Sequence, residues 1–367
     1  MNWKTLWIPT AALAGVWVLT GLSGRIHVTP AQAQQSVISP QADQTDTLPV
    51  VLSTTSYLTD IAQNVAGDRL EIRTLVPLGI DPHGFEPTPA DVRAVADSDA
   101  LIINGSGFEE FLGNLLANAG GERVVISASE GLEMRIPGGE EITHGHVHSD
   151  QHNSDEHNHA DHDHEHSDGH SHDDHSHGHS DEQAHDDHEH AHGGDPHFWT
   201  DPRQVMSYVE TIRDGLSELD PTGQEVYAAN AAAYLEELAA LDAEVEALVS
   251  GIPEPDRLLV TDHDSLGYFA DRYGFRVVGA VIPNFSTGTS PSARELAGLI
   301  DIISETGARA IFTDLASSTQ IAEQLSADLG IPLVYLYTHS ITAPDGEAPS
   351  YIEMMRHNAK AIVAALE

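Results

Sequence analysis

Short apolar runs alternate with helix-like segments along most of this chain, and that order limits the folds that the chain can adopt. In the first part, the strand-like runs lie at 49–55, 70–77, 100–105 and 123–129, and the helix-like segments lie at 56–66, 89–97 and 108–118. Gly67 follows the first helical pattern, and Thr88 with Pro89 opens the second, as helix ends and starts require. This order predicts a parallel sheet covered by helices.

A second series of the same kind fills the C-terminal part. Its strand-like runs lie at 257–262, 275–282, 308–314 and 332–338, and its helix-like segments lie at 265–273, 291–306, 317–329 and 349–366. The sequence therefore predicts an α/β protein with two βα lobes, each containing a parallel sheet. The expected boundaries are 48–220 for the N-terminal lobe and 256–367 for the C-terminal lobe.

A segment rich in Ala, Leu and Glu separates the two series. A helix is expected at 202–219, and 221–251 is expected to form one long, rigid helix that links the lobes. Its apolar residues recur at helical spacing, at Val226, Ala229, Ala233, Leu235, Leu238, Leu241, Val245 and Leu248. At a rise of 1.5 Å per residue, such a helix is about 40 Å long, which is enough to bridge two lobes.

A tract of His, Asp, Glu, Ser and Gly at 140–194 interrupts the first series. Its sequence, for example "HADHDHEHSDGHSHDDHSHGHSDE", has no hydrophobic period and too little apolar surface to fold alone. We expect a mobile His-rich insertion within the N-terminal lobe. Residues 34–47 are also polar, and we expect a disordered lead-in there.

The composition excludes several classes of function. The 367-residue chain has 58 Asp and Glu against 16 Lys and Arg, for a formal net charge of −42. Nucleic-acid binding rests on clustered basic residues, so no nucleic-acid partner is expected. The charge also disfavours an anionic membrane surface and attracts cations. With 24 histidines and no cysteine, the chain can form no disulfide and carry no lipid-modified cysteine, and any metal site must use His, Asp or Glu.

The N-terminus has the pattern of an export signal. Lys4 provides a basic start, 6–22 is apolar, and Ala31-Gln32-Ala33 fits a small-x-small cleavage site. Residues 1–33 are therefore expected to be removed after Ala33; the alternative is a retained membrane anchor. No other run is long and apolar enough to span a bilayer. The mature protein is expected to be soluble and periplasmic, with no segment inserted in the membrane.

Five histidines lie outside the tract and the N-terminal segment: His83, His197, His263, His339 and His357. His83 follows a predicted strand, His197 opens an ordered-looking segment, and His263 and His339 stand at the ends of two further predicted strands. In open α/β sheets, ligands bind beyond the carboxyl ends of the strands, so one site between the lobes is predicted. Imidazole suits Zn²⁺, which takes four donors in a tetrahedron. His357, on the last helix, is expected to be hydrogen-bonded or exposed.

Carboxylates neighbour three of these histidines in sequence, at Asp81, Asp195, Asp262 and Asp264. Each has two alternative roles. It can accept the second ring N–H of a metal-binding histidine, or it can cap a turn.

Several motifs together resemble one family, the metal-binding, extracytoplasmic solute-binding proteins of ABC transporters for zinc and manganese. These motifs are "GIDPHGFEPTPADVRAV", "DPHFWTDPRQV", "VTDHDSLGYFADRYG", "IFTDLASST" and "LYTHSI…PSYIEMMRHNAKAI", and the resemblance runs from about Pro49 to Glu367. It implies two βα lobes joined by a long rigid helix, with the metal held in the cleft between them. It also implies binding without catalysis and an ABC permease as the membrane partner. We expect the protein to be a monomer.

The resemblance implies His83, His197 and His263 as ligands; the third position is histidine in zinc-type members and glutamate in manganese-type members. The fourth position is often Asp or Glu in the family. Here it is His339, so either His339 or a water molecule completes the ligand set. Imidazole donors without a required carboxylate favour Zn²⁺ over Mn²⁺. The His-rich insertion also resembles zinc-type members.

The expected function is a high-affinity zinc receptor that delivers Zn²⁺ to a permease, and three alternatives remain open. The protein could store or buffer zinc through the tract, it could be a manganese receptor, or it could be an exported zinc hydrolase with a metal-bound water. No HExxH motif occurs, and closed coordination suits binding better than catalysis. The tract is expected to offer many weak metal sites, because ordering a mobile loop costs conformational entropy.

Overall fold

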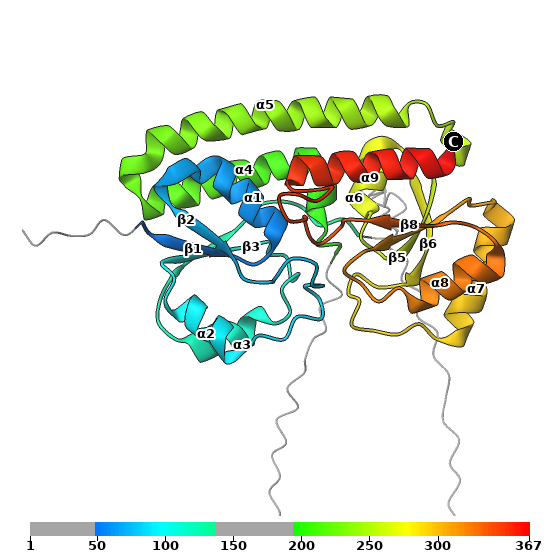
Figure 1. Ribbon diagram of the computed structural model, residues 1–367, viewed down its shortest axis with the longest axis horizontal. Coiled ribbons are helices and arrows are strands. Elements are labelled where there is room, and N and C mark those ends of the chain that lie inside the picture. The colour runs from blue at the N-terminus through cyan, green and yellow to red at the C-terminus, as the bar shows by residue number, and fades with distance from the viewer. Residues whose placement is uncertain (1–47, 137–193) are drawn as a thin grey trace, which may run out of the picture. The chain divides into compact units, whose positions relative to one another are not determined.

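The computed structural model describes residues 48–136 and 194–367. The expected leader (1–33), the lead-in (34–47) and all but the last residue of the expected insertion (140–194) lie outside these described residues. Two four-stranded parallel sheets are present, as the sequence predicts (Figure 1). Among the described helices, none has both the length and the apolar character needed to cross a membrane.

The first sheet has the strand order β2-β1-β3-β4. Its strands are β1 (Val50–Ser53), β2 (Glu71–Thr74), β3 (Ala100–Ile103) and β4 (Val124–Ser127). Its helices are α1 (Ser56–Ala66), α2 (Pro89–Ala96), α3 (Leu112–Ala119) and α4 (Pro202–Leu219). Successive strand residues point to opposite faces, so Val51 packs with α1 and α4 whereas Leu52 packs with α2 and α3.

The second sheet repeats this arrangement with the order β6-β5-β7-β8. Its strands are β5 (Leu258–His263), β6 (Arg276–Ile282), β7 (Ile311–Asp314) and β8 (Leu333–Leu336). Its helices are α6 (Gly267–Tyr273), α7 (Ala293–Thr306), α8 (Gln320–Leu329) and α9 (Tyr351–Leu366). Leu259 packs on the side of α6 and α9, and Val260 packs on the side of α7 and α8.

The long helix α5 (Gln224–Val249) packs against α1, α4 and α9 and so contacts helices of both lobes (Figure 1). The expected aliphatic stripe is wrong in its first half: Val226 is 40% exposed, and the buried face begins instead at Tyr227 and continues through Tyr234. The aliphatic pattern misses these two tyrosines, whose apolar rings are buried. One continuous apolar core includes Val51, Leu238 and Leu259, so the lobes share a core.

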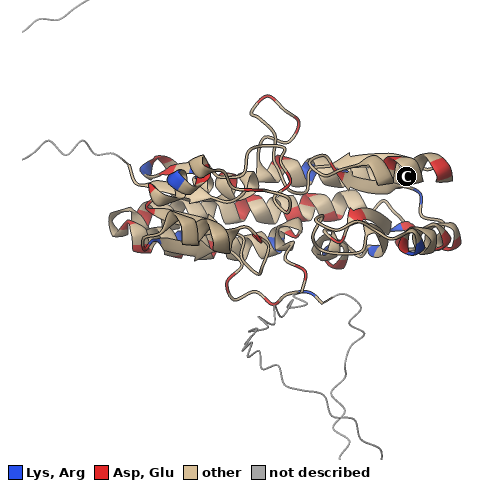
Figure 2. Ribbon diagram, turned by 90° about the horizontal axis from the view of Figure 1, so that it is seen from below, with Lys and Arg blue, Asp and Glu red and all other residues tan. Residues whose placement is uncertain are grey.

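Paired charges also join the lobes. Asp242, in the middle of α5, accepts hydrogen bonds from Arg203 of α4 (2.9 Å) and from Arg272 of α6 (2.8 and 2.6 Å). The Tyr273 hydroxyl donates a further bond to the same carboxylate (3.1 Å). Acidic residues are spread over both lobes and basic ones are few (Figure 2). Two of these few arginines therefore serve to hold the lobes together at the linking helix.

The helix expected at 108–118 begins only at Leu112. The preceding residues form turns around Glu109, a buried carboxylate that accepts bonds from the Asn104 N–H (2.6 Å) and the Gly105 N–H (3.0 Å). Gly105 has a φ of 85°, a conformation that favours glycine. These contacts delay the helix, and they place Phe108 beside the site described below.

Candidate metal centre

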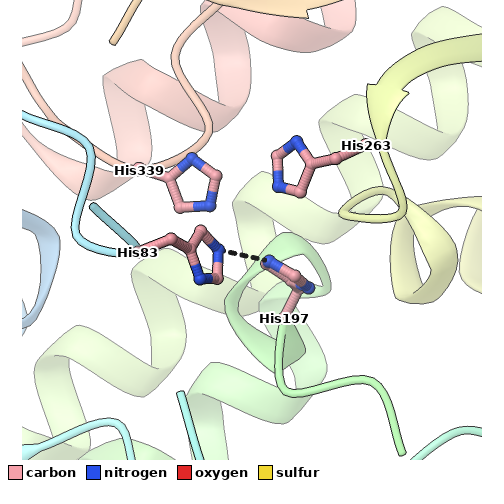
Figure 3. A group of neighbouring side chains, drawn as sticks. All are labelled: His83, His197, His263 and His339. Atoms are coloured by element: carbon pink, nitrogen blue, oxygen red, sulfur yellow. Dashed lines mark hydrogen bonds between the residues drawn. The ribbon is translucent and has the colours of Figure 1, made fainter. Parts of the chain in front are cut away.

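Four histidines from distant parts of the chain meet between the two lobes (Figure 3). His83 lies in the loop between β2 and α2, and His197 immediately precedes a short 3₁₀ helix at Phe198–Thr200. His263 ends β5, and His339 follows β8. One ring nitrogen from each histidine lies within 4.8 Å of the others. The structure therefore brings together all four of the predicted site residues, two from each lobe.

The spacing of the ring nitrogens is close to that of a tetrahedral zinc site. With Zn–N bonds of 2.0–2.1 Å, neighbouring ligand nitrogens in such a site are about 3.4 Å apart. The Nε2 atoms of His83 and His197 are 3.4 Å apart. In the other pairs the ligand nitrogens are at most 4.8 Å apart, so they would need to approach each other by at most about 1.4 Å. Small ring movements would therefore be enough to complete the tetrahedron.

Buried carboxylates orient three of the four imidazole rings. The Nδ1 atoms of His197, His263 and His339 lie 2.8, 3.0 and 2.8 Å from carboxylate oxygens of Asp195, Asp262 and Asp314, respectively. A carboxylate only accepts, so in each neutral ring Nδ1 carries the proton and Nε2 keeps its lone pair. This arrangement, a metal-facing nitrogen backed by a carboxylate, is typical of histidine ligands.

Several ring nitrogens of these histidines have no hydrogen-bond partner among the described residues. The Nε2 atoms of His263 and His339 are buried and have no hydrogen-bond partner among the described residues. A buried polar atom without a partner costs free energy, so such atoms in a native site indicate a missing ion or water. His83 differs, because its Nδ1 is also buried without a partner in the described part of the chain. The donor set and its unpartnered nitrogens thus fit a cation held by imidazole.

Aromatic rings line the cluster. The Phe108 ring lies edge-on to His83 at 4.9 Å between centroids, and the Trp199 ring lies 5.1 Å from His197 and 5.8 Å from His339. Trp199 is buried, stacks on Tyr57 at 4.6 Å, and donates its Nε1–H to the Thr338 carbonyl (2.6 Å). Apolar walls lower the local dielectric, which favours the neutral form of a buried imidazole. Neither ring is among the site residues predicted from the sequence.

Hydrogen bonds connect the lobes close to the cluster. The Thr287 hydroxyl donates to the Asp81 carboxylate (2.6 Å), and the Gly79 N–H donates to the Ser340 hydroxyl (2.9 Å). Both bonds join the loop that carries His83 to loops of the C-terminal lobe. The relative position of the histidines therefore depends on how the two lobes meet.

Comparison with known proteins identifies the family. Residues 51–365 match the family model described as zinc-uptake complex component A, periplasmic (ZnuA). The chain belongs to the ZnuA family. It is thus a metal-binding substrate-binding protein of the ABC-transporter type, as its motifs suggest. Such proteins work with a membrane permease and an ATPase.

Two curated relatives of this ZnuA-family protein differ in the metal that they are named for. The manganese-binding lipoprotein MntA of Halalkalibacterium halodurans is 31% identical, with 86% of this chain and 88% of MntA covered. The zinc-binding lipoprotein AdcA of Streptococcus pneumoniae is 29% identical, with 83% of this chain but 53% of AdcA covered. Both are named lipoproteins, whereas the present sequence contains no cysteine.

A solved structure confirms the fold. The periplasmic zinc-binding protein TroA of Treponema pallidum superposes with a TM-score of 0.67 at 24% identity, with 87% of this chain and 99% of TroA covered. The two βα lobes predicted from the sequence are therefore the fold of a known metal-binding protein.

Burial and charge set the protonation of the cluster in this ZnuA-family protein. Burial lowers the pKa of His83 and His197 well below the usual value, and the neighbouring imidazoles lower it further. Burial also acts to lower the pKa of His263, but the charge and hydrogen bond of Asp262 outweigh it, so this pKa is raised. Burial acts to raise the pKa of Asp314, but hydrogen bonds from His339 and Thr338 hold it well below its usual range.

The carboxylates proposed from sequence have different roles in the structure. Asp195 and Asp262 each bond a histidine ring, but Asp81 caps the His83 N–H (3.0 Å) and reaches Thr287 instead. Asp264 shows no bond to a histidine ring among the described residues. Asp314 is not among the carboxylates predicted from the sequence. The signal for it is a carboxylate at the end of β7, because β7 lies between β5 and β8.

His357 lies outside the cluster. It is half-buried on α9, and its ring lies 4.9 Å from the ring of Tyr337. Its Nδ1 is 4.0 Å from a carboxylate oxygen of Glu347, which is exposed. His357 is therefore a suitable control for substitutions of the other four histidines.

Proposed function

We propose that this protein is a periplasmic receptor that binds Zn²⁺ with high affinity through His83, His197, His263 and His339. The receptor, a soluble monomer, delivers the ion to the permease of an ABC transporter. The observation that carries this proposal is the set of buried imidazole nitrogens that face one another without other partners among the described residues. Four protein donors leave no open position for a substrate or a reactive water, which favours transport over catalysis.

The choice of zinc over manganese rests on the donor atoms. Imidazole suits zinc, whereas manganese prefers carboxylate, carbonyl and water oxygens. The carboxylates nearest the cluster are hydrogen-bonded to ring nitrogens, which occupies them as supports. MntA, named as manganese-binding, is 31% identical to this chain, so manganese is the competing cargo that an experiment must test.

Metal titration of the purified protein tests the proposal. After removal of bound metal with a chelator, zinc and manganese are titrated separately, with competition against a chromophoric chelator for the tight range. We expect one tight zinc site and manganese binding at least about tenfold weaker, because sites with nitrogen donors have a higher affinity for zinc than for manganese. Trp199, the only tryptophan beyond residue 33, gives an independent fluorescence signal beside the cluster. Manganese binding that is tighter than zinc binding would contradict the proposal.

Deleting the His-rich insertion is expected to leave the tight zinc site intact. The Asp195 N–H donates to the Arg135 carbonyl (2.7 Å), so the described residues on either side of 137–193 already lie together and a short Gly-Ser linker can join them. Calorimetric titration should show unchanged affinity at one site and the loss of additional, weaker zinc equivalents. Loss of the tight site together with the insertion would instead favour storage or buffering by the tract.

A further inference from the structure

Arg135 and Asp195 form a closed junction at the base of the insertion. They pair as an antiparallel bridge in which the Asp195 N–H donates to the Arg135 carbonyl at 2.7 Å. Arg135 is among the last residues described before position 137, and Asp195 is among the first described after 193. Both residues belong to the N-terminal part of the chain, and the contact joins two segments that are distant in sequence.

A tyrosine from the C-terminal lobe forms hydrogen bonds with both residues of this junction. The Tyr268 hydroxyl, on α6, accepts a hydrogen bond from the Arg135 N–H (2.8 Å) and donates one to the Asp195 carbonyl (2.8 Å). Tyr268 is 6% exposed, and its ring packs on Phe198 at 4.7 Å between centroids. One hydroxyl thus bonds the backbone of both residues of the junction.

The Arg135 side chain and a glycine complete the contact. The Arg135 Nε–H donates to Asp271 (2.7 Å), and Arg135 Nη1 lies 3.8 Å from the Asp195 carboxylate. A side chain at Gly267 would displace the side chains of Arg135 and Asp195, because its Cβ would lie 2.5 Å from Arg135 Nη1 and 2.5 Å from Asp195 Oδ2. The first turn of α6 therefore approaches the junction as closely as glycine permits.

Asp195 connects this junction to a candidate metal ligand. Its Oδ1 accepts bonds from the His197 backbone N–H (2.9 Å) and from His197 Nδ1 (2.8 Å), and its side chain is fully buried. The backbone N–H and C=O of Asp195 are both bonded within the junction, the first to Arg135 and the second to Tyr268. The backbone of Asp195 is therefore held by contacts outside the cluster, and its buried carboxylate bonds His197.

We propose that Tyr268 is a positioning residue for the metal site: through its hydroxyl it fixes Asp195, and Asp195 fixes the ring orientation and tautomer of His197. This inference rests on the proposed function, because it assigns His197 as a ligand. Tyr268 belongs to the C-terminal lobe and His197 to the N-terminal lobe. The support of one ligand is therefore provided from across the lobe interface, beside the ends of the insertion.

The Tyr268→Phe variant tests this role with little structural disturbance. It removes the hydroxyl and both of its bonds, and it keeps the ring that packs on Phe198. Tyr335→Phe is the matched control, because Tyr335 is 40% exposed on β8 and its hydroxyl bonds only Glu323 (3.4 Å) among the described residues. Asp195→Asn serves as a reference for damage to the direct partner of His197.

Two quantities are measured on the full-length protein. The first is zinc affinity by chelator competition: loss of an outer-shell partner costs about 10- to 100-fold, and we expect Asp195→Asn in that range and Tyr268→Phe about three- to tenfold weaker than wild type. The second is the His197 tautomer in the metal-free protein, read from its ¹H–¹⁵N imidazole signals, which are assigned by their loss in His197→Ala. The downfield Nδ1–H signal should weaken or broaden in Tyr268→Phe and stay unchanged in Tyr335→Phe.

The outcomes separate the two proposals. If the wild-type protein lacks a tight zinc site, the proposed function fails, whatever the variants do. If wild type binds zinc tightly and Tyr268→Phe has the affinity and imidazole spectrum of Tyr335→Phe, only the positioning role is overturned. A lower affinity with an unaltered His197 tautomer also overturns it, because Tyr268 would then act on stability alone.

Discussion

Replacement of His83 by alanine is expected to weaken zinc binding by roughly 100- to 1,000-fold. Apparent binding free energies of four-ligand zinc sites are about 10–16 kcal/mol, so one ligand in four contributes about 2.5–4 kcal/mol. His83 is the most informative position, because it lies in a loop and no carboxylate partner of its ring is found among the described residues. Its removal therefore disturbs the ligand set with little effect on its supports. Chelator competition with the purified variant gives the dissociation constant.

Two further variants are needed to interpret this result, one as a control and one to identify the fourth ligand. His357→Ala also removes an imidazole, but one that packs against Tyr337 outside the cluster, so its zinc affinity should equal that of wild type. His339→Ala decides the fourth ligand: a loss similar to that of His83→Ala indicates direct binding, and a loss of about tenfold or less indicates water in that position. If His83→Ala bound zinc as tightly as His357→Ala, the four-histidine site would be disproved.

Zinc affinity should fall steeply as the pH is lowered. A ligating imidazole must be neutral, and protons compete with the metal below the pKa of the ring. His263, whose pKa is raised because Asp262 outweighs the effect of burial, takes a proton at higher pH than His83 and His197, whose pKa values are lowered. Below the pKa of His263 the apparent dissociation constant should therefore rise about tenfold per pH unit. Between about pH 7.5 and pH 5, a loss of at least about 30-fold is expected, because the pKa of His263 is raised above about 6.5.

The source of this pH dependence can be tested in one variant. In His263→Ala the affinity should be lower throughout, but its fall should begin at a lower pH, because the ring with the raised pKa is absent. Titrations in buffers of different ionisation enthalpy count the protons released on zinc binding, and wild type should release more protons than the variant near pH 6.5. Tight zinc binding that persists unchanged at about pH 4.5 would contradict imidazole ligation.

The fold follows from the sequence wherever local signals agree with packing. The helices at Ser56–Ala66 and Pro202–Leu219 have the expected bounds, because Gly67 ends the first and Pro202 begins the second. The helical pattern predicts the start of α3 wrongly, because tertiary contacts outweigh it. Glu109 accepts hydrogen bonds from the backbone of Asn104 and Gly105, and the helix starts only at Leu112. On α5 the buried tyrosines are invisible to an aliphatic pattern.

The candidate ligands are predictable for a topological reason. The carboxyl ends of parallel strands share one edge of a sheet, so histidines at those ends can be placed near one another without knowing the contacts. Their supports are harder to predict. Asp314 reaches His339 only because β7 and β8 are neighbours in register, and Tyr268 reaches Asp195 only because the lobes meet at α6. Such contacts depend on strand order and lobe packing, which cannot be predicted from a short sequence motif.

The junction of Arg135 with Asp195 has a consequence for the history of the insertion. Because Arg135 and Asp195 are already joined there, the residues between them close a loop whose entropic cost grows only with the logarithm of its length, about 0.6 kcal/mol per doubling. Residues could thus be gained or lost between Arg135 and Asp195 at almost constant stability of the scaffold. The length and histidine content of this segment are free to drift or to be selected, and an engineer could exchange it for another sequence.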